Sequence, residues 1–245
     1  MEFQNQTAVI TGGASGIALV TAQKLAKEGA NLVLLDVDQK KLEEETARLK
    51  QEGCAVLGIV TDVRDYGQVQ KAVHQAKEEF GAIDILINCA GGSAGRVFHT
   101  ERSLDKIPIE VLDWGIDVNF RAPLYLSRAV INTMLEQKRG VIINVGSIMG
   151  ITGGTDAEYC AAKSGMIGLT KSLALIGAPA GVRCCCVTPG PVLTRPNMAE
   201  MYTPLGRAAQ PSEIADLILY LCSEKAAFIT GANYMIDGGR ACGAK

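Results

Sequence analysis

Aromatic residues make up only 5% of the 245-residue chain, and its net charge is -2. A nucleic-acid-binding surface relies on aromatic stacking and on a strongly basic face, so this composition argues against such a partner. The apolar runs are strand-sized, far short of a membrane span, and the N-terminal segment has no basic region followed by an apolar one. We therefore expect a cytoplasmic protein that binds neither nucleic acid nor a membrane.

Histidine is scarce, and the cysteines lack the spacing of metal ligands. His74 and His99 are not placed near paired cysteines and there is no C-x-x-C, so the sequence predicts no metal site. A chain of this size without an export signal has little need of disulfides. The three cysteines at 184–186 lie in an apolar strand pattern, where successive side chains alternate between two faces, and we interpret them as core residues.

What the chain does contain is a regular alternation of short apolar runs and longer amphipathic segments. The segments at 39–53 and 65–81 have apolar positions on one helical face and charge on the other. Strands are predicted at 7–11, 31–36, 55–62, 83–89, 140–147, 182–189 and 233–239. This pattern predicts an α/β fold: a single doubly wound, Rossmann-type domain over 1–245, with about seven parallel strands covered by helices on both faces.

A glycine-rich turn joins the first predicted strand to the first helix. Gly12 and Gly16 frame it, Ser15 and Ile17 belong to it, and Ala18 is a third small residue. Such a turn lets the backbone approach a pyrophosphate at the helix N-terminus.

Asp36 ends the next strand, where a carboxylate accepts hydrogen bonds from an adenosine ribose. A carboxylate there repels a 2′-phosphate, and Val37 follows it instead of a basic residue, so NAD(H) is favoured over NADP(H).

Tyr159 and Lys163 are four residues apart on one predicted helix, and Ser147 ends the preceding apolar strand. Residues at this spacing share a helical face, where a nearby ammonium stabilises a tyrosinate. That arrangement makes a phenol usable as a general acid or base. The alternative is a surface Tyr–Lys pair with no catalytic role.

In this order the motifs resemble the short-chain dehydrogenase/reductase family over essentially the whole chain. TGGASGIA resembles its cofactor turn, NCAGG at 88–92 its N-N-A-G segment, and TPGPVLT at 188–194 its P-G segment. The resemblance implies a catalytic set of Asn119, Ser147, Tyr159 and Lys163, with Asn119 holding a water and Lys163 also binding the nicotinamide ribose. It implies further cofactor contacts at Asp62 and Val63 near the adenine, at Asn88, Ala90 and Gly91 along the ribose, and at Pro189, Gly190, Val192 and Thr194. It also implies a homotetramer.

The chain departs from the family pattern in three places. Ser147 and Tyr159 are one residue closer than in most members, and Thr152 and Thr155 are less favoured alternative hydroxyls. The segment after Gly91 is longer than usual, and the one after Pro189 is short for a substrate lid. Arg96, His99 and Arg102 are candidates for binding an anionic substrate, although a solvated loop balanced by Glu101 and Asp105 is the preferred interpretation.

These observations predict an NAD-dependent oxidoreductase of secondary alcohols or ketones, of the polyol, sugar, hydroxysteroid or 3-hydroxyacyl type. Two alternatives remain. One is an NADPH-dependent 3-oxoacyl carrier-protein reductase, which Asp36 disfavours. The other is a non-catalytic NAD-binding sensor, which the presence of both Tyr159 and Lys163 disfavours.

Overall fold

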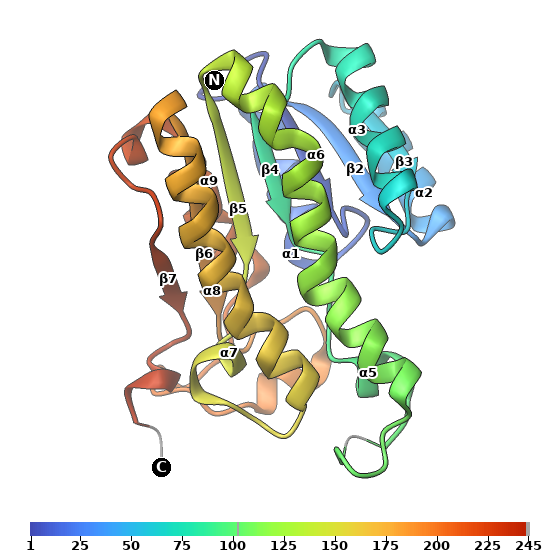
Figure 1. The fold of residues 1–245 in the computed structure, drawn as a ribbon, viewed down its shortest axis with the longest axis vertical. Coiled ribbons are helices and arrows are strands. Elements are labelled where there is room, and N and C mark those ends of the chain that lie inside the picture. Colours follow the sequence, from blue (N-terminus) through green and yellow to red (C-terminus); the bar gives the residue numbers. More distant parts are fainter. Residues whose placement is uncertain (102, 244–245) are drawn as a thin grey trace.

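A computed structural model describes residues 1–101 and 103–243, and these build one seven-stranded parallel sheet in the order β3-β2-β1-β4-β5-β6-β7 (Figure 1). The strands are β1 Thr7–Thr11, β2 Asn31–Asp36, β3 Val56–Val60, β4 Ile85–Asn88, β5 Gly140–Val145, β6 Val182–Pro189 and β7 Asn233–Ile236. Each lies within its predicted segment, so the predicted fold class is confirmed.

The α-helices follow the strands in alternation. They are α1 Gly16–Lys27, α2 Gln39–Gln51, α3 Tyr66–Phe80, α4 Ala94–Val97, α5 Ile109–Ile116, α6 Ala122–Gln137, α7 Met149–Thr152, α8 Ala157–Gly177 and α9 Pro211–Cys222. A π-helical turn, η1 Asp117–Arg121, joins α5 to α6, and short 3-10 turns lie at η2 Ala178–Ala180, η3 Pro196–Glu200, η4 Glu224–Ala226 and η5 Arg240–Cys242. Within the described ranges, no helix has both the length and the apolar character needed to cross a bilayer.

Both faces of the sheet are buried, which explains the near-continuous apolar strands. Alternate residues of β1 separate into two cores: Ile10 packs with side chains of α1 and α9, whereas Val9 packs with side chains of α3, α6 and α8. In β6, Cys185 lies in the first core while Cys184 and Cys186 lie in the second, and all three are free. The prediction that these cysteines are core residues on alternating faces is therefore confirmed.

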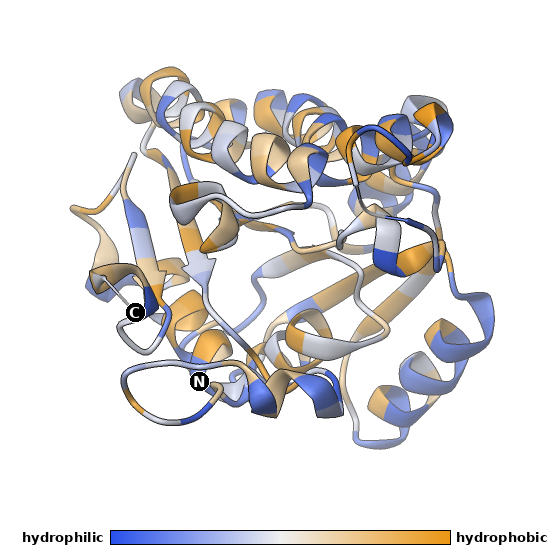
Figure 2. Cartoon of the chain, turned by 90° about the horizontal axis from the view of Figure 1, so that it is seen from below, coloured by the Kyte–Doolittle hydropathy of each residue, from blue (hydrophilic) through white to orange (hydrophobic). Residues whose placement is uncertain are grey.

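Because all strands are parallel, their carboxyl ends meet at one edge of the sheet, which is the lower edge in Figure 1. Figure 2 is seen from that side and shows the sheet between two layers of helices. The chain order reverses between β1 and β4, since β2 and β3 extend to one side and β5 to β7 to the other. Ligands of doubly wound sheets bind in the crevice at such a switch point.

A buried amide network fixes helix α8 to the sheet beside this crevice. Asn144 of β5 accepts a hydrogen bond from Asn88 Nδ2 of β4 at 2.9 Å and donates one to Thr170 Oγ1 of α8 at 2.9 Å. Thr170 Oγ1 in turn donates to the carbonyl of Met166. Three elements are therefore joined through one fully buried side chain.

We expect Asn144→Ala to lower the free energy of unfolding by about 1–3 kcal/mol, because the Asn88 amide loses its acceptor in a water-free interior. Urea unfolding followed by circular dichroism measures this. Asn132→Ala is the matched control, since Asn132 is exposed on α6. Equal stability of the two variants would contradict a structural role for the network.

Candidate active site

The glycine turn lies at the switch point, and its glycines let neighbouring backbone segments approach it closely. Gly12 and Gly16 have φ of 68° and 58°, in the region that favours glycine. A Cβ at Gly12 would stand 3.1 Å from Ala90 Cα, so β1 and the β4 loop meet without room for a side chain. Ser15 is the exposed N-cap of α1 and makes no side-chain cap bond, and the first turn of α1 contains no acidic residue. The N–H groups of this first turn and the positive end of the helix dipole therefore suit an anion.

The carboxylate of Asp36 supports this turn from the end of β2. Its Oδ2 accepts the Ala14 N–H and its Oδ1 accepts the Asp38 N–H, both at 3.0 Å. A carboxylate has about four acceptor sites, so these two bonds orient Asp36 and leave capacity for ligand hydroxyls.

The loop after β4 is held by Thr11 at the end of β1. Thr11 Oγ1 accepts the N–H groups of Cys89 at 2.9 Å and of Ala90 at 3.0 Å. The side chain of Asn88, predicted to lie along the ribose, is instead directed into the sheet, where it bonds Asn144. Burial raises the pKa of the Cys89 thiol to about 11, so this cysteine is a neutral group.

Asn119 lies in the π-helical turn and connects that loop to α5. Its Nδ2 donates to the carbonyls of Gly92 and Gly115, each at 2.9 Å, and its Oδ1 accepts the Gly92 N–H at 3.0 Å. Gly91 is adjacent, with φ of 151°, and a Cβ there would overlap Asn119 Oδ1 and stand 3.6 Å from Lys163 Nζ. The structure thus brings Asn119, Gly91 and Lys163 together, and π-turns of this kind are frequent at functional sites.

Helix α8 contributes Tyr159 and Lys163 to the same place. Lys163 is buried and donates to the Val145 carbonyl at 2.8 Å, and its Nζ lies 5.7 Å from the centre of the Tyr159 ring. An ammonium can donate three hydrogen bonds, so Lys163 retains donors for a ligand. No side chain or backbone group of the described residues pairs with the half-buried Tyr159 hydroxyl.

Ser147 follows β5, and its Oγ accepts the Met149 N–H at 3.2 Å, which leaves the hydroxyl proton free to be donated. The short helix α7 lies directly on α8: a Cβ at Gly150 would stand 2.6 Å from the Lys163 carbonyl carbon, and Ser164 Oγ donates to the Gly150 carbonyl at 2.5 Å. The segment from Ser147 to Gly150 is therefore fixed. The turn after it is exposed, and Gly153 there has φ of 77°.

The segment after β6 lies next to the glycine turn. Thr194 Cγ2 lies 3.5 Å from the place of a Cβ on Gly16, and the Val192 carbonyl accepts the Thr194 N–H at 2.6 Å. Pro189 is buried, and its carbonyl accepts the Ile148 N–H, which joins this segment to the loop of Ser147. Gly190 packs against Asp237, where a Cβ would stand 2.7 Å from Asp237 Cα.

Comparisons with known proteins agree with this geometry. A family model described as enoyl-(acyl carrier protein) reductase matches residues 12–241. A (2S)-[(R)-hydroxy(phenyl)methyl]succinyl-CoA dehydrogenase subunit of Thauera aromatica is 33% identical, with 98% of each chain covered. The 7alpha-hydroxysteroid dehydrogenase of Bacteroides fragilis is 31% identical over 97% of this chain and 95% of its own. The crystal structure of levodione reductase matches with a TM-score of 0.91 at 30% identity, covering 99% and 100% of the two chains.

The chain belongs to the short-chain dehydrogenase/reductase family. The predicted oxidoreductase class is thereby confirmed, and this family uses nicotinamide cofactors. Within the described part of the chain, no group of three or more His, Cys, Asp or Glu residues is arranged to hold a metal ion.

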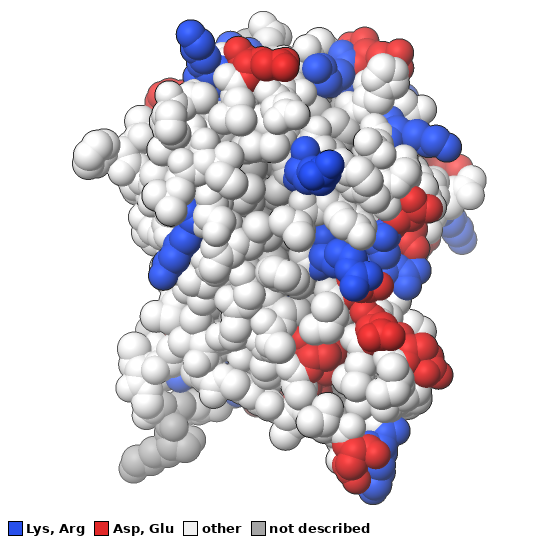
Figure 3. Space-filling model, viewed as in Figure 1, with Lys and Arg blue, Asp and Glu red and all other residues white. Residues whose placement is uncertain are grey.

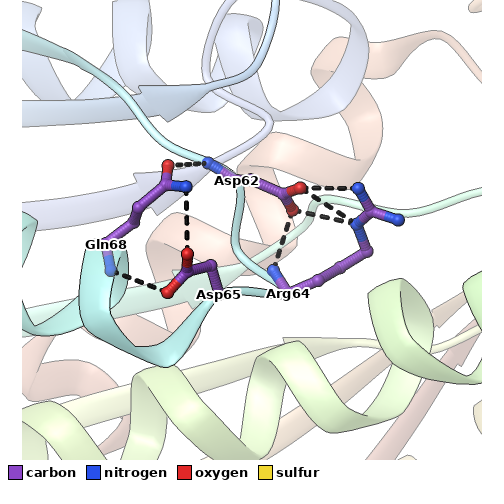
Figure 4. Close-up of polar contacts among 4 residues, drawn as sticks. All are labelled: Asp62, Arg64, Asp65 and Gln68. Atoms are coloured by element: carbon purple, nitrogen blue, oxygen red, sulfur yellow. Dashed lines mark hydrogen bonds and ion pairs between the residues drawn. The ribbon is translucent and has the colours of Figure 1, made fainter.

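In this short-chain dehydrogenase, Asp62 and Val63 follow β3. Val63 is buried, and both carboxylate oxygens of Asp62 face the Arg64 guanidinium, with the Nη2–Oδ2 pair at 2.6 Å (Figure 4). The hydrogen bond from Arg64 holds the pKa of Asp62 below its usual value. Gln68 and Asp65 brace the same turn, since Gln68 Oε1 accepts the Asp62 N–H at 2.9 Å. Asp62 is thus a fixed, ionised carboxylate beside β3.

Two of the three basic positions singled out from the sequence lie in the described segment after β4. The Arg96 guanidinium, on α4, lies against Gly92 where a Cβ would otherwise be, whereas His99 is exposed. Arg102 lies outside the described residues.

Sequence reasoning missed Arg195, which follows Thr194 and has buried guanidinium nitrogens without a partner. It also missed Asp156 and Glu158, buried just before Tyr159, each with one unpaired oxygen. Only the fold reveals these unpaired groups.

We expect Gly91→Ala to destabilise the enzyme, because the added Cβ displaces Asn119 from the loop. Gly53→Ala is the matched control: Gly53 also has positive φ, at 82°, but an added Cβ meets nothing within 4 Å. Strain alone should lower the stability of the control by about 1 kcal/mol. The loss for Gly91→Ala should be greater by about 1–3 kcal/mol, as for an overpacked site. Urea unfolding of both variants measures the difference, and equal losses would show that Asn119 moves freely.

Proposed function

We propose that this protein transfers a hydride between NAD(H) and a secondary alcohol or its ketone, with Tyr159 as the acid–base group. The observation that supports this is the convergence at Gly91. Asn119 from η1 and Lys163 from α8 meet the β4 loop there, and Tyr159 lies beside Lys163. The glycine turn and Asp36 lie on the other side of that loop, so a cofactor site and a proton-transfer site share one crevice.

The residues present fit a dinucleotide. Close packing at Gly12 and the first-turn N–H groups of α1 suit a pyrophosphate, and Asp36 has acceptor capacity for ribose hydroxyls. The proposed contacts continue along Ser15, Ile17, Asp62, Val63, Ala90, Gly91, Pro189, Gly190, Val192 and Thr194, and through the backbone of Asn88. The nicotinamide supplies or accepts the hydride when it is bound.

In the proposed reaction, residues of the chain transfer the proton and stabilise the charges that form. Tyr159 takes the hydroxyl proton of an alcohol or gives one to a carbonyl oxygen, and its unpaired hydroxyl is available for this. Lys163, with donors left after its bond to Val145, stabilises the tyrosinate and binds the nicotinamide ribose. The free proton of Ser147 is donated to the substrate oxygen as charge develops on it. Asn119 keeps the loop in place and is the proposed holder of a water next to Lys163.

The substrate class is supported by the names of the relatives. They include dehydrogenases of a hydroxy-acyl-CoA, of 2-(S)-hydroxypropyl-CoM, of a 7alpha-hydroxysteroid and of cis-4-hydroxycyclohexanecarboxylate. Each of these names describes oxidation of an alcohol. We therefore propose a secondary alcohol of the polyol, sugar, hydroxysteroid or 3-hydroxyacyl type.

We expect Tyr159→Phe to lower turnover by about 100- to 10,000-fold, the usual contribution of a general acid or base, with NADH affinity retained. NADH formation across a panel of secondary alcohols measures turnover, and fluorescence titration measures binding. Tyr220→Phe on the exposed face of α9 is the control. Full turnover of Tyr159→Phe would refute the mechanism, and tight NADH binding by a wild type that turns over nothing would favour the sensor alternative.

We expect wild type to bind NADH at least about tenfold more tightly than NADPH, because Asp36 repels a 2′-phosphate. Asp36→Asn should lower the ratio of NADH affinity to NADPH affinity by about 10-fold or more, because it removes charge-assisted bonds to the ribose. The control is Asp38→Asn, whose carboxylate instead caps α2 and pairs with Lys41. Fluorescence titration with both cofactors measures the ratio. A wild type that prefers NADPH would favour the 3-oxoacyl carrier-protein reductase alternative.

We also propose a homo-oligomer, a tetramer by family resemblance, in the cytoplasm. Large apolar side chains are exposed at the end of α8, with Leu175 at 78% and Ile176 at 55%, and on β7, with Met235 at 52%. Figure 3 shows that most of the surface over α8 is uncharged. Apolar surface of this kind is typical of subunit contacts, and sedimentation velocity tests the assembly.

A further inference from the structure

Arg195, in the segment after β6, has guanidinium nitrogens without a hydrogen-bond partner among the described residues. Its Nε and Nη1 are buried without a hydrogen-bond partner among the described residues, and its Nη2 contacts only the Met198 sulfur, at 3.1 Å. A buried guanidinium without an anion is costly, because desolvation is not offset by pairing.

Other arginines that the structure describes have hydrogen-bond partners, as three examples show. Arg207, in the same segment after β6, makes two 2.7 Å bonds to the Glu213 carboxylate, and Arg64 is paired with Asp62. Arg183 donates to the backbone carbonyls at the end of α9. Arg195 therefore stands out because two of its buried nitrogens find neither a carboxylate nor a carbonyl among the described residues.

The position of Arg195 indicates which anion it serves. It directly follows Thr194, whose methyl group lies 3.5 Å from the place of a Cβ on Gly16 at the start of α1. The glycine turn from Thr11 to Ala18 contains no lysine or arginine, and α1 has no acidic residue in its first turn. The turn itself therefore offers a pyrophosphate neutral donors and no cation. Arg195, one residue after Thr194, is a long cationic side chain next to this turn.

We propose that Arg195 is the cationic ligand of the cofactor pyrophosphate, a role that rests on the proposed NAD(H) dependence. Its guanidinium closes the segment after β6 over the bound dinucleotide by pairing with phosphate oxygens. Arginine suits this task because its planar fork matches phosphate geometry. In the free protein the guanidinium lies against Met198, and phosphate binding supplies the missing partner.

Binding of NADH and of ADP-ribose tests this without a known substrate. ADP-ribose has the pyrophosphate and lacks the nicotinamide. We expect Arg195→Gln to weaken both ligands by about 10- to 100-fold, the effect of losing a charged hydrogen bond. Arg195→Lys should recover part of the affinity, and the wild-type affinity should fall more steeply with salt than that of Arg195→Gln. Arg128→Gln, with the same charge change on the exposed face of α6, should leave both affinities unchanged.

Thermal unfolding without ligand gives a second readout. Because Arg195→Gln removes an unpaired buried charge, its melting temperature should equal or exceed that of wild type. Unchanged affinity for both ligands, or a loss for NADH with none for ADP-ribose, would overturn the proposal. A rise in the KM for an alcohol substrate, with unchanged NADH affinity, would also overturn the proposal, because Arg195 would then bind the substrate. If wild type bound neither ligand, the proposed function itself would fail.

Discussion

The contact of Asn119 with the β4 loop is the constraint on which the site depends. One amide side chain makes three hydrogen bonds to the backbone, two of them to Gly92. These bonds require a π-turn in the helix and a glycine at 91, because any side chain there would occupy the place of Asn119 Oδ1. They also set where the loop stands relative to Lys163. The β4 loop and helix α5 are thus joined through one side chain.

A second hydrogen-bond network, centred on Asn144, also supports the site. Asn144 joins β4, β5 and α8 in a fully buried network, so the helix that carries Tyr159 cannot slide along the sheet without breaking polar pairs that water cannot replace. Apolar packing alone would tolerate small shifts of α8. Directional bonds to an amide make one position preferred, which proton transfer over hydrogen-bond distances demands.

The strands were predictable because burial on both faces imposes continuous apolar runs, and β1, β2 and β6 have the predicted bounds. The contacts made by particular side chains were harder to predict than the strands. The side chain of Asn88 lies on the same face of β4 as Leu86, where it bonds Asn144. The sequence did not reveal that partner, because Asn144 is distant along the chain. The bonds of Asn119 to Gly92 are also contacts between segments distant in sequence. The unpaired state of Arg195 could not be predicted, because it depends on what the whole fold fails to supply.

Hydrogen bonding separates the supporting residues of the crevice from those proposed to meet ligands. Thr11 and Asn119 have their polar atoms bonded to backbone groups, so they hold the loops. Asp36 supports the glycine turn and also keeps acceptor capacity for a ligand. Lys163 and Ser147 are each oriented by one bond and keep a donor free. Two nitrogens of Arg195 are buried without a partner among the described residues, and so is one carboxylate oxygen each of Asp156 and Glu158. Buried polar groups are normally paired, so unpaired ones close to the proposed site are where a ligand would complete the set.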